Sequence, residues 1–134
     1  MAKTQDRIYI DKSDRKLYDE IEFFSERSRK EQFLLAMAYG FKNDITKKID
    51  KQDGFFLIKD MRTEDEALMY SVALYHFKKL EILVDKNEIY KIVEEYARAG
   101  IKLLHDEVTS TEFGSFDLKL EKELTNIYES INID

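Results

Sequence analysis

EQFLLAMAYGF, residues 31–41, is apolar on every side. A helix without a polar face must be enclosed by the rest of a core or by a membrane, and this stretch is too short to cross roughly 30 Å of hydrocarbon. It therefore predicts the centre of a globular core. The preceding SRKE, residues 28–31, matches a capping box that starts a helix near Arg29. Gly40 predicts the helix end, because glycine adopts the left-handed conformation of many C-caps.

The residues before the core helix alternate in polarity and then change period. Residues 3–10 place Ile8 and Ile10 on one face, which predicts a short strand. Asp11 or Ser13 can cap a following helix. The inward stripe of that helix is expected to comprise Leu17, Ile21 and Phe24.

The residues after the core helix predict a linker, an extended segment and three helices. Residues 42–54 are polar, and the short apolar run that follows fits a buried strand or an extended connection. A second capping box, residues 63–66, starts a helix, and Asp85 or Asn87 starts a longer one. Gly100 falls on the buried stripe of that longer helix, so a neighbouring backbone is expected to approach it closely. A final helix is expected from Ser115.

These patterns together predict a mainly α protein, with a short N-terminal strand followed by a compact bundle of about five helices. Residues 1–42 form a strand-helix-helix unit, residues 43–54 a polar linker, and residues 55–134 a helical region that packs on the first unit. The whole is expected to be one compact unit, because 134 residues suffice for an ordinary core.

The composition limits the cellular compartments and the kinds of chemistry that fit this chain. The chain contains no cysteine, which excludes disulfides, thiolate zinc sites and thiol catalysis. It opens with no signal peptide, and no apolar run approaches the length of a membrane span. We therefore expect a cytoplasmic protein without a membrane contact.

The charge is distributed unevenly between the two halves of the sequence. Residues 1–51 carry 12 Lys/Arg against 10 Asp/Glu, whereas residues 52–134 carry 10 against 18. An acidic body argues against wrapping nucleic acid over the whole surface, but it leaves room for a local basic patch near the N-terminus. An ordinary solvated charged surface is the simpler interpretation.

Recognisable catalytic, cofactor and metal motifs are absent from the sequence. His76 and His105 fall on separate predicted helices without a second histidine four residues on. The carboxylate pair Glu94-Glu95 points in two directions on a helix, and capping explains the acidic run at residues 64–66. No phosphate-binding glycine loop is present. We expect a protein that is not an enzyme and holds no cofactor or metal.

The N-terminal strand, helix and capped helix are similar to a ribbon-helix-helix unit, a dimeric DNA-binding module. In that module paired strands enter the major groove and the start of the second helix holds phosphate. The resemblance implies a homodimer on duplex DNA, in which Gln5, Arg7 and Tyr9 face the bases and Ser28, Arg29 and Lys30 meet the backbone. Acidic residues flank the ribbon, and an ordinary edge strand remains the alternative.

Three blocks further along carry a second resemblance. They are FLLAMAYGFK (residues 33–42), ALMYSVALYHF (residues 67–77) and IVEEYARAGIKLL (residues 92–104). In content, order and spacing they resemble the Dnd system-associated protein 4 family, which accompanies DNA phosphorothioation genes. The resemblance covers roughly residues 31–106. It implies a context of DNA modification and defence, with no catalytic residues to carry over.

Two functional hypotheses follow from these patterns. The first is a non-enzymatic accessory or regulatory protein of a DNA modification or defence system, dimeric, with protein partners in that system and DNA contacted through the N-terminal ribbon. The second is a helical protein-interaction adaptor that makes no nucleic-acid contact and whose acidic C-terminal half docks a basic partner.

Overall fold

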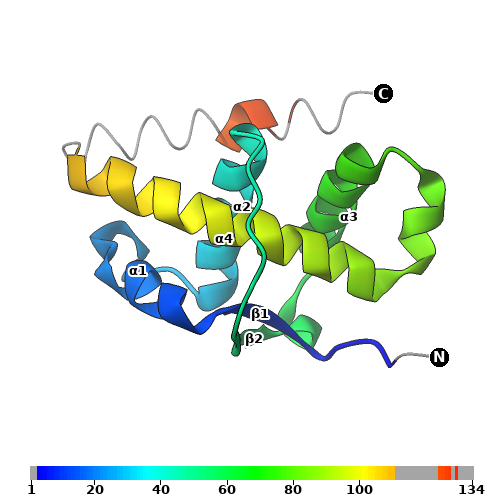
Figure 1. Ribbon diagram of the computed structural model, residues 1–134, viewed down its shortest axis with the longest axis horizontal. Helices are drawn as coiled ribbons and strands as arrows, with labels where there is room; N and C mark the ends of the chain where they lie inside the picture. The colour runs from blue at the N-terminus through cyan, green and yellow to red at the C-terminus, as the bar shows by residue number, and fades with distance from the viewer. Residues whose placement is uncertain (1–2, 111–123, 128, 130–134) are drawn as a thin grey trace.

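The computed structural model describes residues 3–110, 124–127 and 129. Figure 1 shows the longest helix, α4, running along the molecule, with α2 crossing it and α1, α3 and the strands arranged around it. The expected mainly α fold with a short N-terminal strand is confirmed. The order is β1 (Arg7–Asp11), η1 (Lys12–Asp14), α1 (Arg15–Glu20), η2 (Glu22–Phe24), α2 (Arg29–Lys42), β2 (Gln52–Leu57), η3 (Ile58–Asp60), α3 (Thr63–Phe77), η4 (Leu80–Val84) and α4 (Lys86–Ser110).

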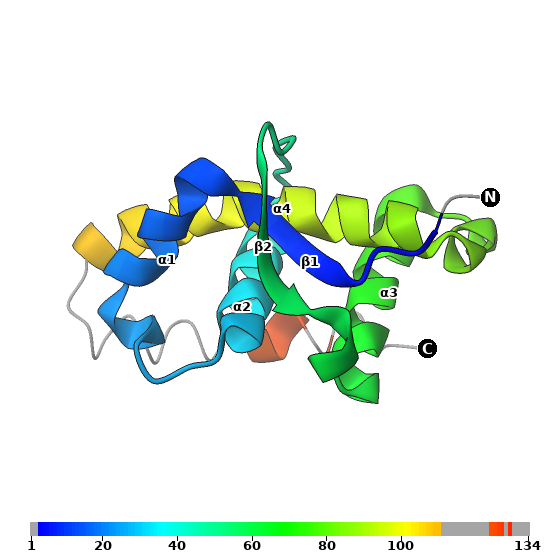
Figure 2. The ribbon, with the colours of Figure 1, turned by 90° about the horizontal axis from the view of Figure 1, so that it is seen from below.

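Strand β1 pairs with β2 in an antiparallel two-stranded sheet (Figure 2). The predicted alternation is confirmed, because Ile8 and Ile10 are 0% and 2% exposed and face the core. The pairing differs from the ribbon-helix-helix interpretation, in which this strand would pair with its copy across a dimer. Its partner lies beyond residue 42 of the same chain, at residues 52–57.

The segment after β1 is not the single helix that the sequence predicts. It breaks into η1, α1 and η2, and Ile21 between the last two is extended, with φ −83° and ψ 106°. The expected stripe of Leu17, Ile21 and Phe24 therefore does not lie on one helix. The break turns Phe24 inward beside Tyr18, and these two aromatic residues and Ile21 are each 1% exposed.

Helix α2 begins as predicted and ends later than predicted. The Glu31 N–H donates to Ser28 Oγ at 3.2 Å, and the Ser28 N–H donates to the Glu31 carboxylate at 3.4 Å, which completes the capping box. Gly40 does not end the helix, which continues to Lys42. The left-handed conformation falls at Asp44, whose φ is 55°.

Gly40 is needed instead where α2 crosses α4. A Cβ atom on Gly40 would lie 2.0 Å from the Tyr96 carbonyl oxygen of α4. A Cβ atom on Gly100 would lie 1.8 Å from the Ala36 carbonyl oxygen of α2. The two helices thus touch backbone to backbone, which confirms the close approach predicted at Gly100.

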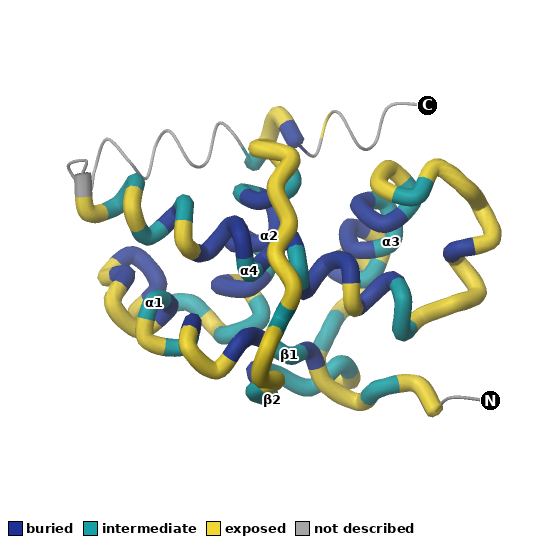
Figure 3. The backbone as a smooth tube through the Cα atoms, in the orientation of Figure 1, coloured by how far each residue is buried: buried dark blue, intermediate teal, exposed yellow. Residues whose placement is uncertain are grey.

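The polar segment between α2 and β2 lies across α4 as an extended chain, largely exposed in Figure 3. The Lys47 N–H donates to the Glu95 carbonyl at 3.0 Å, which fixes the segment to that helix. Strand β2 begins at Gln52, so the last three residues of the predicted linker, residues 52–54, belong to the sheet.

Part of the predicted final helix is described. Residues 124–127 are helical; Leu124 packs against the core, and Ile127 is 8% exposed. Ser115 and the remainder of that predicted helix lie outside the described residues. Within the described ranges, no helix combines the length and the apolar character that a membrane crossing requires.

Candidate interaction surfaces

The three residues predicted to face DNA bases separate in the structure. Arg7 and Tyr9 lie on the outward face of β1, where the Arg7 side chain is 46% exposed and Tyr9 is half-buried. Gln5 is turned inward, because its Nε2 donates to Glu94 Oε2 and to the Arg7 carbonyl, both at 2.9 Å. The structure therefore leaves two of the three residues facing outward.

The three residues predicted to meet phosphate are bonded within the chain. Ser28 caps α2 together with Glu31. Arg29 pairs with Asp19 at 2.7 Å and lies over the Phe55 ring at 4.8 Å. Lys30 pairs with Asp65 at 2.9 Å, where their side chains are 16% and 7% exposed. The start of α2 thus meets carboxylates of its own chain, the groups that a phosphate would have to displace.

The outer edge of β1 is also bonded within the chain. The Tyr9 N–H donates to Glu94 Oε2 at 2.9 Å, and the Arg7 carbonyl accepts from Gln5 Nε2. These backbone groups point away from β2, toward the edge that a ribbon-helix-helix dimer would use. Pairing with a second β1 would have to break both bonds. Each hydrogen bond contributes about 1 kcal/mol to stability, and more when a charged group takes part.

Arg98 on α4 forms ion pairs with several acidic side chains beside the sheet. Its side chain is 8% exposed and lies 3.2 Å from Asp11 and 3.6 Å from Asp14. It also donates to the Lys48 carbonyl of the connecting segment. Burial raises the pKa of Asp14 to about 6, although the Arg98 charge opposes this. Burial also raises the pKa of Asp11. Hydrogen bonds that Asp11 accepts, first among them those from Ser13, lower it by more and hold the pKa well below its usual range.

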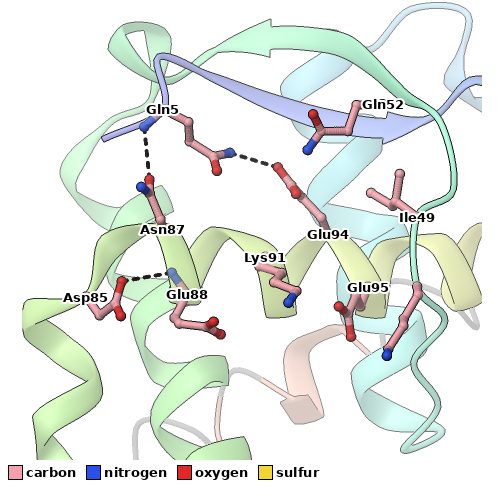
Figure 4. A pocket seen from close by; sticks show the side chains of 10 residues that line it. Gln5, Ile49, Gln52, Asp85, Asn87, Glu88, Lys91, Glu94 and Glu95 are labelled. Carbon is pink, nitrogen blue, oxygen red and sulfur yellow. Dashed lines mark hydrogen bonds between the residues drawn. The ribbon is translucent and has the colours of Figure 1, made fainter. Parts of the chain in front are cut away.

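A groove of about 560 Å³ lies over α4, between the N-terminal segment and the segment that connects α2 to β2 (Figure 4). We call it the α4 groove. Six charged side chains line it: Asp85, Glu88, Glu94, Glu95, Lys48 and Lys91. Figure 4 shows Lys91 between Glu88 and Glu95 along α4; Lys91 is exposed and the two carboxylates are half-buried. Even without the buried Glu94, three carboxylates against two ammonium groups give the groove a negative balance.

Glu94 is the buried acid of the α4 groove, at 4% exposed. Burial raises the pKa of its carboxyl to about 7, although the hydrogen bonds from Tyr9 and Gln5 favour the ionised form. The nearby charge of Glu95 adds to the rise. Glu94 therefore changes its charge near neutral pH, and the same carboxyl group accepts the hydrogen bond from the Tyr9 N–H at the edge of β1.

The sequence grouped Glu94 with Glu95 as an ordinary helical pair and so missed its burial. A usable signal was present. Glu94 lies four residues after Tyr90 and seven before Ile101, which are 1% and 0% exposed. That spacing puts Glu94 on a second apolar stripe of α4, where a carboxylate needs internal donors.

The N-terminal residues lie along the groove as an extended segment. The Gln5 N–H donates to Asn87 Oδ1, and Asn87 Nδ2 donates to the Lys3 carbonyl, both at 2.9 Å. Asn87 thus satisfies backbone groups of the segment from the first turn of α4. Side chains of α4 are therefore able to hold an extended chain at this place.

The two histidines have separate partners. His76 Nδ1 lies 2.8 Å from the Tyr96 hydroxyl, and His105 Nε2 lies 2.8 Å from Glu20 Oε1. In the described part of the chain no three His, Cys, Asp or Glu side chains gather as metal ligands would.

The α4 groove is the strongest candidate site in the described residues, because it combines its volume with charged side chains and a backbone-binding asparagine. Its geometry suits a cationic, extended ligand. No protein-family model, curated protein or solved structure matches the chain, so this assignment rests on the residues of the groove themselves.

Proposed function

We propose that this chain is a non-enzymatic accessory protein of a DNA modification or defence system, and that it works as an adaptor that binds a basic segment of a partner protein. The system is taken from the resemblance to the family associated with DNA phosphorothioation. The adaptor role is supported above all by the negative balance of the α4 groove.

The charges around the groove favour a partner that carries lysine or arginine. Glu88 and Glu95 are half-buried and flank the exposed Lys91 on α4, where they can meet a cation without crossing the core. The surrounding half of the sequence, residues 52–134, has a net charge of −8, which would raise the association rate of a basic partner.

The backbone contacts favour an extended segment as the bound form. Asn87 already binds one extended stretch through paired hydrogen bonds, and the Lys47 N–H binds the Glu95 carbonyl from the other side of the groove. These bonds are made within the chain, so a partner segment that lies between the two extended walls would gain ion pairs with the groove carboxylates.

Co-purification of this chain with DNA phosphorothioation proteins co-expressed with it tests the proposal. Glu95→Lys should lower the recovered partner at least about fivefold, and Lys91→Glu should raise it, because the two changes move the groove charge in opposite directions. Glu26→Lys, the same change at an exposed position away from the groove, is the matched control. Recovery that is unchanged in both groove variants would exclude the groove as the binding site.

Duplex DNA is a second candidate ligand, and the outward Arg7 favours it. Among the contacts of the described residues, the ion pair that Arg7 forms is with the exposed Asp6, at 3.5 Å. An exposed ion pair of this kind contributes little stability in water. Labelled duplex at about 50 mM salt should shift with the full chain, and less with Arg7→Ala. Absence of a shift at that salt concentration would exclude DNA binding, and a shift that Arg7→Ala leaves unchanged would exclude binding through Arg7.

A further inference from the structure

Three aliphatic side chains project from η4, the turn that connects α3 to α4. Leu80, Leu83 and Val84 are 71%, 38% and 89% exposed, whereas Ile82 between them is 5% exposed and anchors the turn. Figures 1 and 2 both place this turn at one end of the molecule. We call these three side chains the η4 ridge. Single exposed aliphatic residues are common, but three on one five-residue turn form an apolar surface.

A small hollow lies directly beside the ridge. Its volume is about 220 Å³, and Phe77 and Ile82 supply apolar walls. Lys79, Glu81, Asp85 and Glu88 complete the lining. The hollow is lined by Glu81 and Ile82 of the same turn, so the segment carries projecting aliphatic side chains next in sequence to the walls of a hollow of a size to receive one of them.

The charges around the ridge are balanced, unlike those of the surrounding sequence. Residues 78–88 contain three lysines (Lys78, Lys79 and Lys86) and three carboxylates (Glu81, Asp85 and Glu88). Residues 52–134 as a whole have a net charge of −8. A second copy of this acidic chain would meet the least repulsion at such a neutral surface, and each lysine could face a carboxylate of the other copy.

We propose that the η4 ridge is the contact surface for a second copy of this chain. In a two-fold dimer the same patch of both copies forms the contact. A projecting side chain of each copy can then fill the hollow of the other copy, so the contact is made twice. Leu80 or Val84 of one copy enters the hollow of the other. A strongly basic partner would prefer an acidic rim, and the rim here is neutral. The contact is small, so the dimer forms only at high protein concentration.

Sedimentation of the full chain over a range of concentrations tests the dimer. Leu80→Glu and Val84→Glu should each raise the dissociation constant at least about tenfold, because each buries a charge in the contact. Ile45→Glu makes the same change at a side chain that is 42% exposed in the connecting segment, and it should leave the constant unchanged. Circular dichroism verifies that the variants fold.

Cross-linking gives an independent readout, because the chain contains no cysteine. Val84→Cys should be joined to its own copy by a short bismaleimide, whereas Ile45→Cys should not. A chain that stays monomeric at millimolar concentration would overturn the dimer. So would a dimer that both ridge variants leave intact. Partner recovery in the Glu95→Lys experiment is read separately, so the groove and the ridge can fail independently.

Discussion

Glu94 connects the N-terminal strand to the longest helix through a single carboxylate. Its Oε2 accepts from the Tyr9 N–H and from Gln5 Nε2, and its side chain is almost completely buried. A buried carboxyl with few compensating charges favours its neutral form. The residue therefore couples the protonation of the α4 groove to the stability of the fold.

The raised pKa of Glu94 predicts how stability depends on pH. The pKa is 4.5 in an unperturbed glutamate and about 7 in the folded chain, so the folded state binds this proton more tightly than the unfolded state. The stabilisation from that proton is complete below pH 4.5 and is lost as pH rises through 7.

Glu94→Gln should remove this loss, because the amide oxygen still accepts hydrogen bonds and carries no charge. Urea unfolding should show the variant close to wild type at pH 5 and more stable by about 1 to 3 kcal/mol at pH 8. Glu26→Gln, the same change at an exposed position away from the groove, is the control. The prediction would be contradicted if variant and wild type differed in free energy of unfolding by the same amount at pH 5 and at pH 8.

Arg98 shows why the network beside the sheet was not predicted. Asp11 and Asp14 are close in sequence, and Asp11 was expected, with Ser13 as the alternative, to cap a helix. The structure uses Asp11 to cap η1, but also to accept from the Asp50 and Lys51 N–H groups and to pair with Arg98. Those partners lie about 40 to 90 residues away, so no local pattern in the sequence connects them.

At the scale of elements, the crossing of α2 and α4 organises the core. Gly40 and Gly100 remove the two Cβ atoms that would keep the helices apart. Close backbone approach then lets Ala36 and Ala97, both fully buried, pack in the same crossing region of the two helices. The sequence predicted the role of Gly100 but assigned Gly40 to a helix end, because a glycine near the end of an apolar run fits either role.

Gly100→Ala should destabilise the protein strongly, because its methyl group would lie 1.8 Å from the Ala36 carbonyl oxygen and the helices would have to separate. We expect a loss of about 3 kcal/mol or more in the free energy of unfolding, measured in urea. Gly54→Ala is the matched control. Its new methyl group would meet the flexible Arg7 side chain at 2.8 Å, which can move aside, so the loss should stay below about 1 kcal/mol.

At the scale of the whole molecule, the N-terminal strand belongs to the core of its own chain. Ile8 and Ile10 lie in the same apolar cluster as Phe33 and Met37 of α2. The strand is thus a structural part of the monomer, with its inner face buried and both edges bonded. This placement leaves Arg7 and Tyr9 as the outward residues of the predicted DNA surface.

Two truncations should therefore behave differently. Removal of residues 1–6 takes away the segment held by Asn87 and should cost about 1 to 2 kcal/mol in thermal or urea unfolding. Removal of residues 1–10 also takes away two core isoleucines and the partner of β2, so the chain should lose its cooperative unfolding transition. A stable, cooperative chain after the longer truncation would show that β1 is dispensable.

The sequence by itself determined the local features of this protein. Apolar periodicity and capping boxes predicted the mainly α fold, the start of α2 and the inward face of β1, because these depend on residues a few positions apart. Only the tertiary structure decided the partner of β1, the role of Gly40, the burial of Glu94 and the ion pairs that occupy Arg29 and Lys30. Each of those depends on a contact between distant segments, and such contacts are set by how whole elements pack.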